Sequence, residues 1–157
     1  MAAMAQANLD YDRAVQLLEH RVALTPNNAA AHKAIGRAYV DQGREEIGYA
    51  ELVMALLLDP RDAETLTALG QVHLAAGRTA QAIAALERAL AIDGSNSQAL
   101  HALGNALIRA GRTDEAERRL EESVRRQAQD IDDQRSRRTA AMLSLSVFLQ
   151  PMVSAMG

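Results

Sequence analysis

The side chains that could do acid–base or metal chemistry are few and scattered along this chain. The histidines are His20, His32, His73 and His101, and none has a carboxylate or a second histidine at the helical spacing that lets metal ligands share a face. His32 and His73 fall on positions expected to pack between helices, and only His101 is expected to face a groove. The sequence therefore predicts no catalytic residue, no metal and no cofactor, and we do not expect an enzyme.

Other reactive patterns are equally weak. The serines lack the context of a nucleophile elbow, and Gly-Arg-Thr at 77–79 and 111–113 lacks the strand and the lysine of a phosphate-binding loop. The absence of cysteine excludes disulfides and thiol chemistry. A net charge of -3 gives no electrostatic reason to expect a nucleic acid as partner.

The elements that must position any functional side chain repeat every 34 residues between residues 29 and 130. The pattern can be written in three frames, 29–62, 63–96 and 97–130. Glycine occupies the eighth and the fifteenth place of each frame, and leucine occupies the twenty-fourth. These residues are Gly36, Gly70 and Gly104, then Gly43, Gly77 and Gly111, then Leu52, Leu86 and Leu120.

Each repeated glycine has a physical reason. Glycine inside a helix costs about 1 kcal/mol relative to alanine, so the eighth place implies a close contact between the two helices of a unit. The glycine at the fifteenth place follows the last apolar residue of a helix, where a left-handed cap is favoured. Asp62 and Asn96 are expected to cap first helices, and Thr79 and Thr113 are expected to cap second helices.

A 34-residue unit made of two helix-sized segments resembles the tetratricopeptide repeat. Pro60 and Pro26 stand at the unit-closing proline of that family, whereas Gly94 and Ala128 depart from it. The resemblance implies an all-α fold, a right-handed solenoid of antiparallel helix hairpins.

We expect one solenoid over residues 1–157, with three full repeats between partial end units. Residues 1–28 form a partial repeat whose second helix spans about 10–24. Its residues on the expected places are Leu9, Tyr11, Ala14, Leu18 and Leu24. Residues 131–157 form a C-terminal capping or docking helix.

The resemblance also implies where function resides, because the first helix of each unit lines the concave surface of such a solenoid. We interpret this surface as a groove for a peptide or a partner helix, in a non-catalytic scaffold or adaptor. A plain solvated surface is the alternative. Lys33, Arg37 and Arg109 are suited to acidic groups. The predicted partner-binding groove consists of Lys33, Arg37, Val40, Asp41, Glu64, Thr67, Gln71, Leu74, Gln98, His101, Asn105, Ile108 and Arg109.

The C-terminal part changes character at Arg138. Residues 112–138 contain eight acidic residues and eight arginines, which is typical of a solvated helix. No charged residue follows, and Pro151 is expected to end or kink the helix near Leu149 or Gln150. The predicted docking residues of the apolar segment are Met142, Leu145, Phe148, Leu149 and Met152.

Three interpretations of this apolar segment remain open. It caps the last repeat, docks to another subunit, or touches a membrane. The membrane is the least favoured, because polar residues interrupt the segment and leave it short of the apolar run that a spanning helix needs. The alternative function is accordingly a structural or assembly subunit of a membrane-associated complex, docked through residues 139–157. Self-association through the solenoid ends is a further hypothesis.

The first seven residues have neither a basic start nor a long apolar run, so they do not resemble an intact secretory signal. We expect a cytoplasmic protein, or a periplasmic one if a signal has been removed. Lys33 is the only lysine among 17 basic residues, a bias that suggests a bacterial source.

Overall fold

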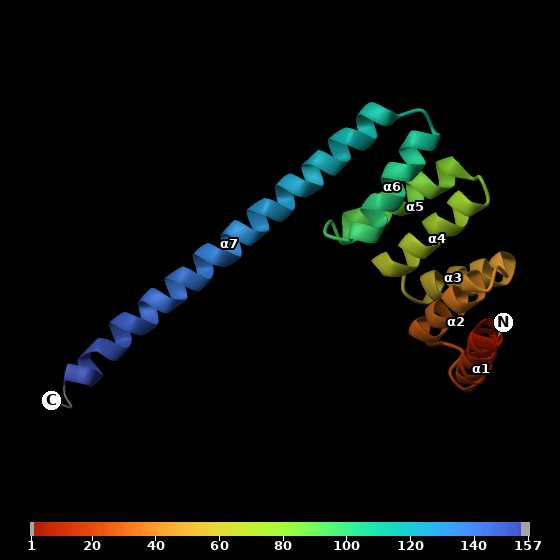
Figure 1. Ribbon diagram of the computed structural model, residues 1–157, viewed down its shortest axis with the longest axis horizontal. Helices are drawn as coiled ribbons and strands as arrows, with labels where there is room; N and C mark the ends of the chain where they lie inside the picture. The colour runs from red at the N-terminus through yellow and green to blue at the C-terminus, as the bar shows by residue number, and fades with distance from the viewer. Residues whose placement is uncertain (1, 155–157) are drawn as a thin grey trace. The chain divides into compact units, whose positions relative to one another are not determined.

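The computed structural model describes the backbone of residues 2–154 and the side chains of residues 12–126 and 128–144. The described residues form helices joined by short turns and contain no strand (Figure 1). The chain divides into two compact units, Met1–Arg119 (unit 1) and Leu120–Gly157 (unit 2). The helices are α1 (Ala2–Leu24), α2 (Ala29–Asp41), α3 (Glu45–Leu58), α4 (Ala63–Ala75), α5 (Thr79–Ile92), α6 (Ser97–Arg109) and α7 (Thr113–Ser154).

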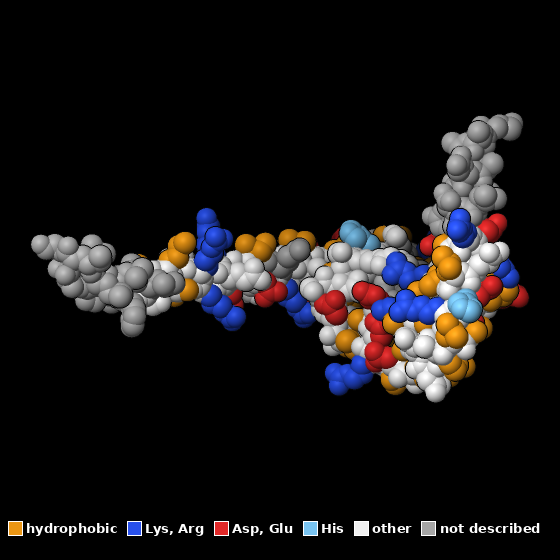
Figure 2. All heavy atoms as spheres, turned by 90° about the horizontal axis from the view of Figure 1, so that it is seen from below, with side chains coloured by type: hydrophobic (Ala, Val, Ile, Leu, Met, Phe, Trp, Pro, Cys, Tyr) orange, Lys and Arg blue, Asp and Glu red, His pale blue; other side chains and the backbone are white. Residues whose placement is uncertain are grey.

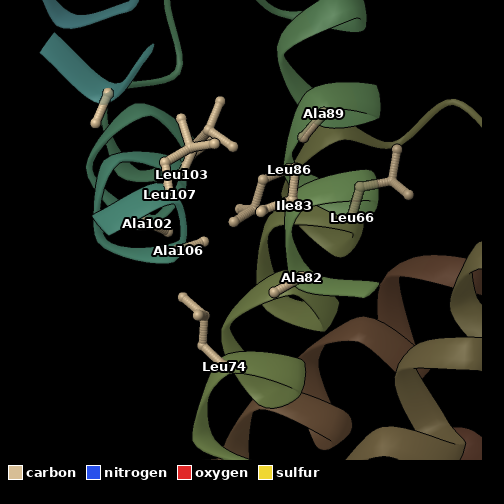
Figure 3. Close-up of a cluster of buried hydrophobic side chains, with 12 residues drawn as sticks. Leu66, Leu74, Ala82, Ile83, Leu86, Ala89, Ala102, Leu103, Ala106 and Leu107 are labelled. Atoms are coloured by element: carbon tan, nitrogen blue, oxygen red, sulfur yellow. The ribbon is translucent and has the colours of Figure 1, made fainter. Parts of the chain in front are cut away.

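Unit 1 is a series of helix hairpins. Each helix from α1 to α5 packs against the next one in the chain, and α4 also contacts α2 and α6. Leucine and alanine side chains from α4, α5 and α6 point toward one another in the main core cluster (Figure 3). Leu86 and Leu103 are almost fully buried there, and Ala116 at the start of α7 belongs to the same cluster. The expected all-α solenoid is confirmed.

Two of the glycines at the eighth place, Gly36 and Gly70, let the two helices of their unit touch, as expected. A Cβ atom built on Gly70 would lie 2.5 Å from Leu86 Cγ and 2.7 Å from Leu86 Cδ2. On Gly36 it would lie 2.8 Å from Leu52 Cγ. A Cβ atom built on Gly48, on the opposing helix α3, would lie 2.7 Å from the backbone oxygen of Gly36. Any larger residue at these places would force the helices apart.

The glycines at the fifteenth place form left-handed caps, which also confirms the prediction. The φ angles of Gly43, Gly77 and Gly111 are 74°, 71° and 74°. After α2, the amide of Gly43 donates to the carbonyl of Val40, and that of Arg44 donates to the carbonyl of Tyr39. This pair of bonds is the Schellman motif, which satisfies the last carbonyls of a helix. The same two bonds recur at Gly77 and Gly111.

First and second helices begin differently. Asp62 and Asn96 accept hydrogen bonds from the first-turn amides of α4 and α6, as predicted, and Asn28 does the same for α2. The prediction for Thr79 is wrong, because Arg78 is the N-cap of α5 and its side chain makes no capping bond. Three residues, Ala76, Gly77 and Arg78, separate α4 from α5, so the threonine already lies inside α5.

Helix α1 differs from the expectation in length and in packing. It begins at Ala2 rather than near residue 10. Its buried contact residue is Val15, with Leu18 and Val22 half-buried beside it, whereas Ala14 and Leu24 are exposed. Because α2 is the helix that α1 packs against, one narrow stripe of residues 12–24 is covered and the other side chains of this range are exposed. Leu9 and Tyr11 lie outside the described side chains.

Helix α7 is continuous over 42 residues. It passes the expected boundary at 130/131 and also Pro151, so the predicted end near Leu149 or Gln150 is wrong. No glycine and no proline lies between Gly111 and Pro151 to interrupt the helix. Within the described residues, no helix is long and apolar enough to cross a membrane.

Candidate partner-binding surface

The first helices of the three repeats are α2, α4 and α6, and α4 lies between the other two. Most of the side chains predicted to line a groove on these helices are exposed or half-buried in the structure. We call these the first-helix face. It consists of Lys33, Arg37, Val40, Asp41, Glu64, Gln71, Gln98, His101, Asn105, Ile108 and Arg109.

Two predicted groove residues are buried and do not belong to this face. Thr67 is 2% exposed, donates to the carbonyl of Ala63 and accepts a hydrogen bond from the Asn96 amide at 3.2 Å. Leu74 is 9% exposed and packs in the core cluster. The neighbouring first helices pack so closely that a threonine and a leucine at these places become core residues.

The charge of Lys33 is compensated within the chain. Its Nζ lies 3.0 Å from Asp62 Oδ2 and 2.8 Å from Glu64 Oε2, so it joins α2 to the start of α4. Burial lowers the pKa of Lys33, but the hydrogen bonds to Glu64 and Asp62 outweigh it, and the pKa is raised. Burial likewise raises the pKa of Asp62, but hydrogen bonds from Thr65 and Lys33 outweigh it, and the pKa is lowered. Lys33 and Asp62 therefore stay charged near neutral pH.

Arg109 connects α6 to the end of α4. Its Nη1 donates to the carbonyl of Leu74 at 3.0 Å, while the residue itself remains exposed. Ile108, beside it, is 55% exposed. An exposed large aliphatic residue next to a guanidinium is suited to a ligand that carries both an apolar side chain and an acidic group.

The ninth place of each repeat carries a polar side chain. Arg37 and Asn105 are exposed and Gln71 is half-buried. Among the described residues, none of their side chains is engaged in a hydrogen bond or an ion pair. Because equivalent places on adjacent first helices are neighbours, these three groups form a row of unused donors and acceptors.

A buried polar cluster escaped the sequence prediction. His32 is 7% exposed; its Nδ1 lies 2.6 Å from Glu51 Oε2 and its Nε2 lies 2.8 Å from the carbonyl of Pro26. Spacing within one helix cannot reveal this pair, because Glu51 lies on α3. His73 is half-buried edge-on to Tyr49. Both histidines therefore hold the packing positions that the sequence predicts.

The described residues bear on metal binding and on one residue of the predicted C-terminal docking site. They contain no group of three or more potential metal-ligating side chains. In the apolar segment, Met142 is exposed. The side chains of Leu145, Phe148, Leu149 and Met152 lie outside the described part of the structure.

Comparison with known proteins gives a family match and several similar structures. Residues 73–137 match the family model of the tetratricopeptide repeat. A crystal structure of MamA is 26% identical, with a TM-score of 0.68 over 76% of this chain and 70% of that one. A second MamA crystal structure is 23% identical (TM-score 0.71; 78% and 67% covered). MamA 41-end from Desulfovibrio magneticus RS-1 is also 23% identical (TM-score 0.70; 81% and 73% covered). Comparison with curated proteins gave no significant match.

Proposed function

We infer that this chain, which belongs to the tetratricopeptide repeat family, is a protein–protein interaction scaffold that binds its partner through the first-helix face. Repeats of this family serve in general to bind proteins, and the family gives no indication of catalysis. The fold shared with MamA agrees with a scaffold.

The row formed by Arg37, Gln71 and Asn105 is the observation that carries this proposal. Amide side chains both donate and accept, so Gln71 and Asn105 are suited to the backbone of an extended peptide or to polar groups along a helix. Val40 and Ile108 lie one helical turn further along their helices, where they offer apolar contact.

The charges of the first-helix face indicate a partner with a carboxylate. Lys33 already has two acidic neighbours, so we do not assign it to the ligand. Arg37 has no acidic partner among the described residues, and Arg109 uses one nitrogen on a neutral carbonyl. We therefore expect an acidic group of the partner at Arg37 or Arg109.

The test is an affinity capture from the source cell with mass spectrometry, followed by calorimetry on each purified partner. The test variant carries Arg37→Ala, Gln71→Ala and Asn105→Ala. We expect it to bind at least about tenfold more weakly, because three contacts made by unpaired polar groups are lost.

A matched control replaces three exposed residues of second helices, with Glu46→Ala, Gln81→Ala and Arg88→Ala. This variant should keep the affinity of the unaltered chain. Equal affinity of both variants would place binding elsewhere and overturn the proposal.

The alternative of a membrane-associated assembly subunit, docked through residues 139–157, stays a prediction. Membrane fractionation of the full chain, compared with a chain that stops at Asp130, separates it from the scaffold reading. Membrane association that is lost on truncation would favour the alternative.

A further inference from the structure

Unit 2 consists of a single helix, the part of α7 that begins at Leu120. Four large aliphatic residues in it, Leu120, Val124, Ile131 and Met142, are 39%, 67%, 63% and 64% exposed. At 3.6 residues per turn they fall within a sector of about 40°. Leu120, Val124 and Ile131 follow one another at spacings of four and seven, as in a coiled-coil seam. A single helix cannot bury such a stripe by itself.

The charges of the same helix form four blocks of alternating sign. Residues 121–122 are acidic and residues 125–126 are basic. Residues 130–133 contain three acids, and residues 135–138 contain three arginines. Figure 2 shows basic and acidic side chains gathered in separate groups along this helix. We number these blocks one to four in chain order.

Most of these charges have no partner within the chain. Among the described residues beyond Leu120, one ion pair is formed, between Glu122 and Arg126. The other charged side chains of the four blocks are exposed and engage no carboxylate or guanidinium there. They are available to a partner that lies along the stripe.

We propose that residues 120–138 of α7 pair with the same segment of a second copy of this chain in antiparallel orientation, about a two-fold axis near residue 129. Reversal places block one of each copy beside block four of the other, and block two beside block three. Every facing pair of blocks then has opposite signs. An interface in which the same patch of both copies is self-complementary is the usual form of a symmetric dimer.

Parallel pairing in register is disfavoured by the same charges. It would set every block against its own copy, acid against acid and arginine against arginine. It would also bring both Arg138 side chains together, because this residue lies in the sector of the stripe. In the antiparallel pair the two Arg138 residues are about 27 Å apart along the axis, at 1.5 Å per residue, and each lies beside Leu120 of the other copy.

Charge reversal tests this pairing in the full chain. The basic-block variant carries Arg135→Glu, Arg137→Glu and Arg138→Glu, and the acidic-block variant carries Glu121→Arg and Glu122→Arg. By sedimentation equilibrium we expect the unaltered chain to dimerise. For each variant alone, the dissociation constant of the dimer should be at least about tenfold higher than for the unaltered chain. An equimolar mixture should recover the dimer, because block one of one variant then faces block four of the other. Circular dichroism checks that helicity is unchanged.

Orientation is tested with cysteines, since the chain has none of its own. Ala128→Cys lies next to the proposed axis and should form an intermolecular disulfide on mild oxidation. Ala141→Cys lies about 36 Å from its symmetry mate and should not. Cross-linking at both positions would show a parallel pair. A monomeric mass of the unaltered chain at the highest concentration measured, or dimers that tolerate either charge reversal, would overturn the proposal as well.

Discussion

His32 is clamped between two hydrogen-bond acceptors, the Glu51 carboxylate and the Pro26 carbonyl. A ring nitrogen must carry a proton to donate to each, so this geometry favours the imidazolium. Burial lowers the pKa of His32, but the hydrogen bonds to Glu51 and Pro26 outweigh it and raise the pKa above 6.5. A raised folded pKa means that this contribution to stability is complete below the unfolded pKa and is lost as pH rises through the folded pKa.

We therefore expect His32→Gln to be destabilising by about 1.5–3 kcal/mol at about pH 5.5, because hydrogen bonds to a charged group are removed. The difference between the variant and the unaltered chain should shrink at about pH 8.5. Urea unfolding at both pH values measures it.

His73 also contributes to the pH dependence of the free energy of unfolding, and the His32→Gln variant separates its contribution from that of His32. Burial, with a smaller effect of nearby Arg78, lowers the pKa of His73, so its contribution to stability runs opposite to that of His32. Only the pH dependence that disappears in His32→Gln belongs to the clamp. A destabilisation that is the same at both pH values would show that folding does not shift the pKa of His32, which would contradict the clamp.

Gly70 tests the close contact between α4 and α5. In Gly70→Ala the new Cβ would meet the branched carbon of Leu86, which is fully buried and cannot move away cheaply. We expect a loss of about 1–3 kcal/mol from overpacking, set against a gain of about 1 kcal/mol from helix propensity. Urea unfolding should show a net loss, and Gly70→Ala should cost less in a Leu86→Ala background, which lacks the clashing Cγ atom. A stabilised Gly70→Ala variant would contradict the contact.

At the scale of the helix, Asp62 combines two roles at the start of α4. One oxygen accepts from the amide of Glu64, and the other accepts from the Thr65 hydroxyl and pairs with Lys33. Asp62→Ala should cost about 1–2 kcal/mol in urea unfolding, because the cap is lost. Asp62→Asn keeps a capping oxygen and should cost less. Equal losses would mean that the charge, rather than the cap, stabilises this junction.

The repeat determines how much of each helix could be predicted. The glycine places, the caps at Asp62 and Asn96, and the solenoid itself follow from chemistry that recurs at fixed spacing. The long α7 could not be predicted from the period, because the second helices α3 and α5 end shortly before Pro60 and Gly94, whereas no glycine or proline lies between Gly111 and Pro151. Helix α1 packs on one neighbour only, so its buried stripe follows the orientation of α2 rather than the repeat.

The candidate surface could be predicted less well than the fold. Helical periodicity places a residue on a face, but it does not tell how far the next helix covers that face. Thr67 and Leu74 are buried because α4 and α6 approach closely. The pairing of Lys33 with Asp62 and Glu64 depends on the register between two repeats, as does the bond from Arg109 to Leu74. Such contacts between helices leave no signal in the spacing of a single helix.

At the scale of the whole molecule, the proposed dimer has a thermal signature. A dimer that forms only from folded chains is stabilised by mass action, so the melting temperature of the full chain should rise by about 2–4 °C per tenfold increase in concentration. A chain that stops at Asp130 loses block four, two of the three acids of block three and Ile131 of the stripe. It should melt cooperatively through the core of unit 1, at a temperature independent of concentration. Circular dichroism at several concentrations checks both chains.

The three left-handed glycines have a further consequence. Their φ angles differ by no more than 3°, so the backbone turns in nearly the same way after each first helix. Residues 63–96 begin at a capped helix start and end just before another. A tandem duplication of that segment would create only one new junction, between two identical units, with leucine, alanine and glycine at the places that already pack. The length of the binding surface is thus open to change by gene duplication, without any new turn having to evolve.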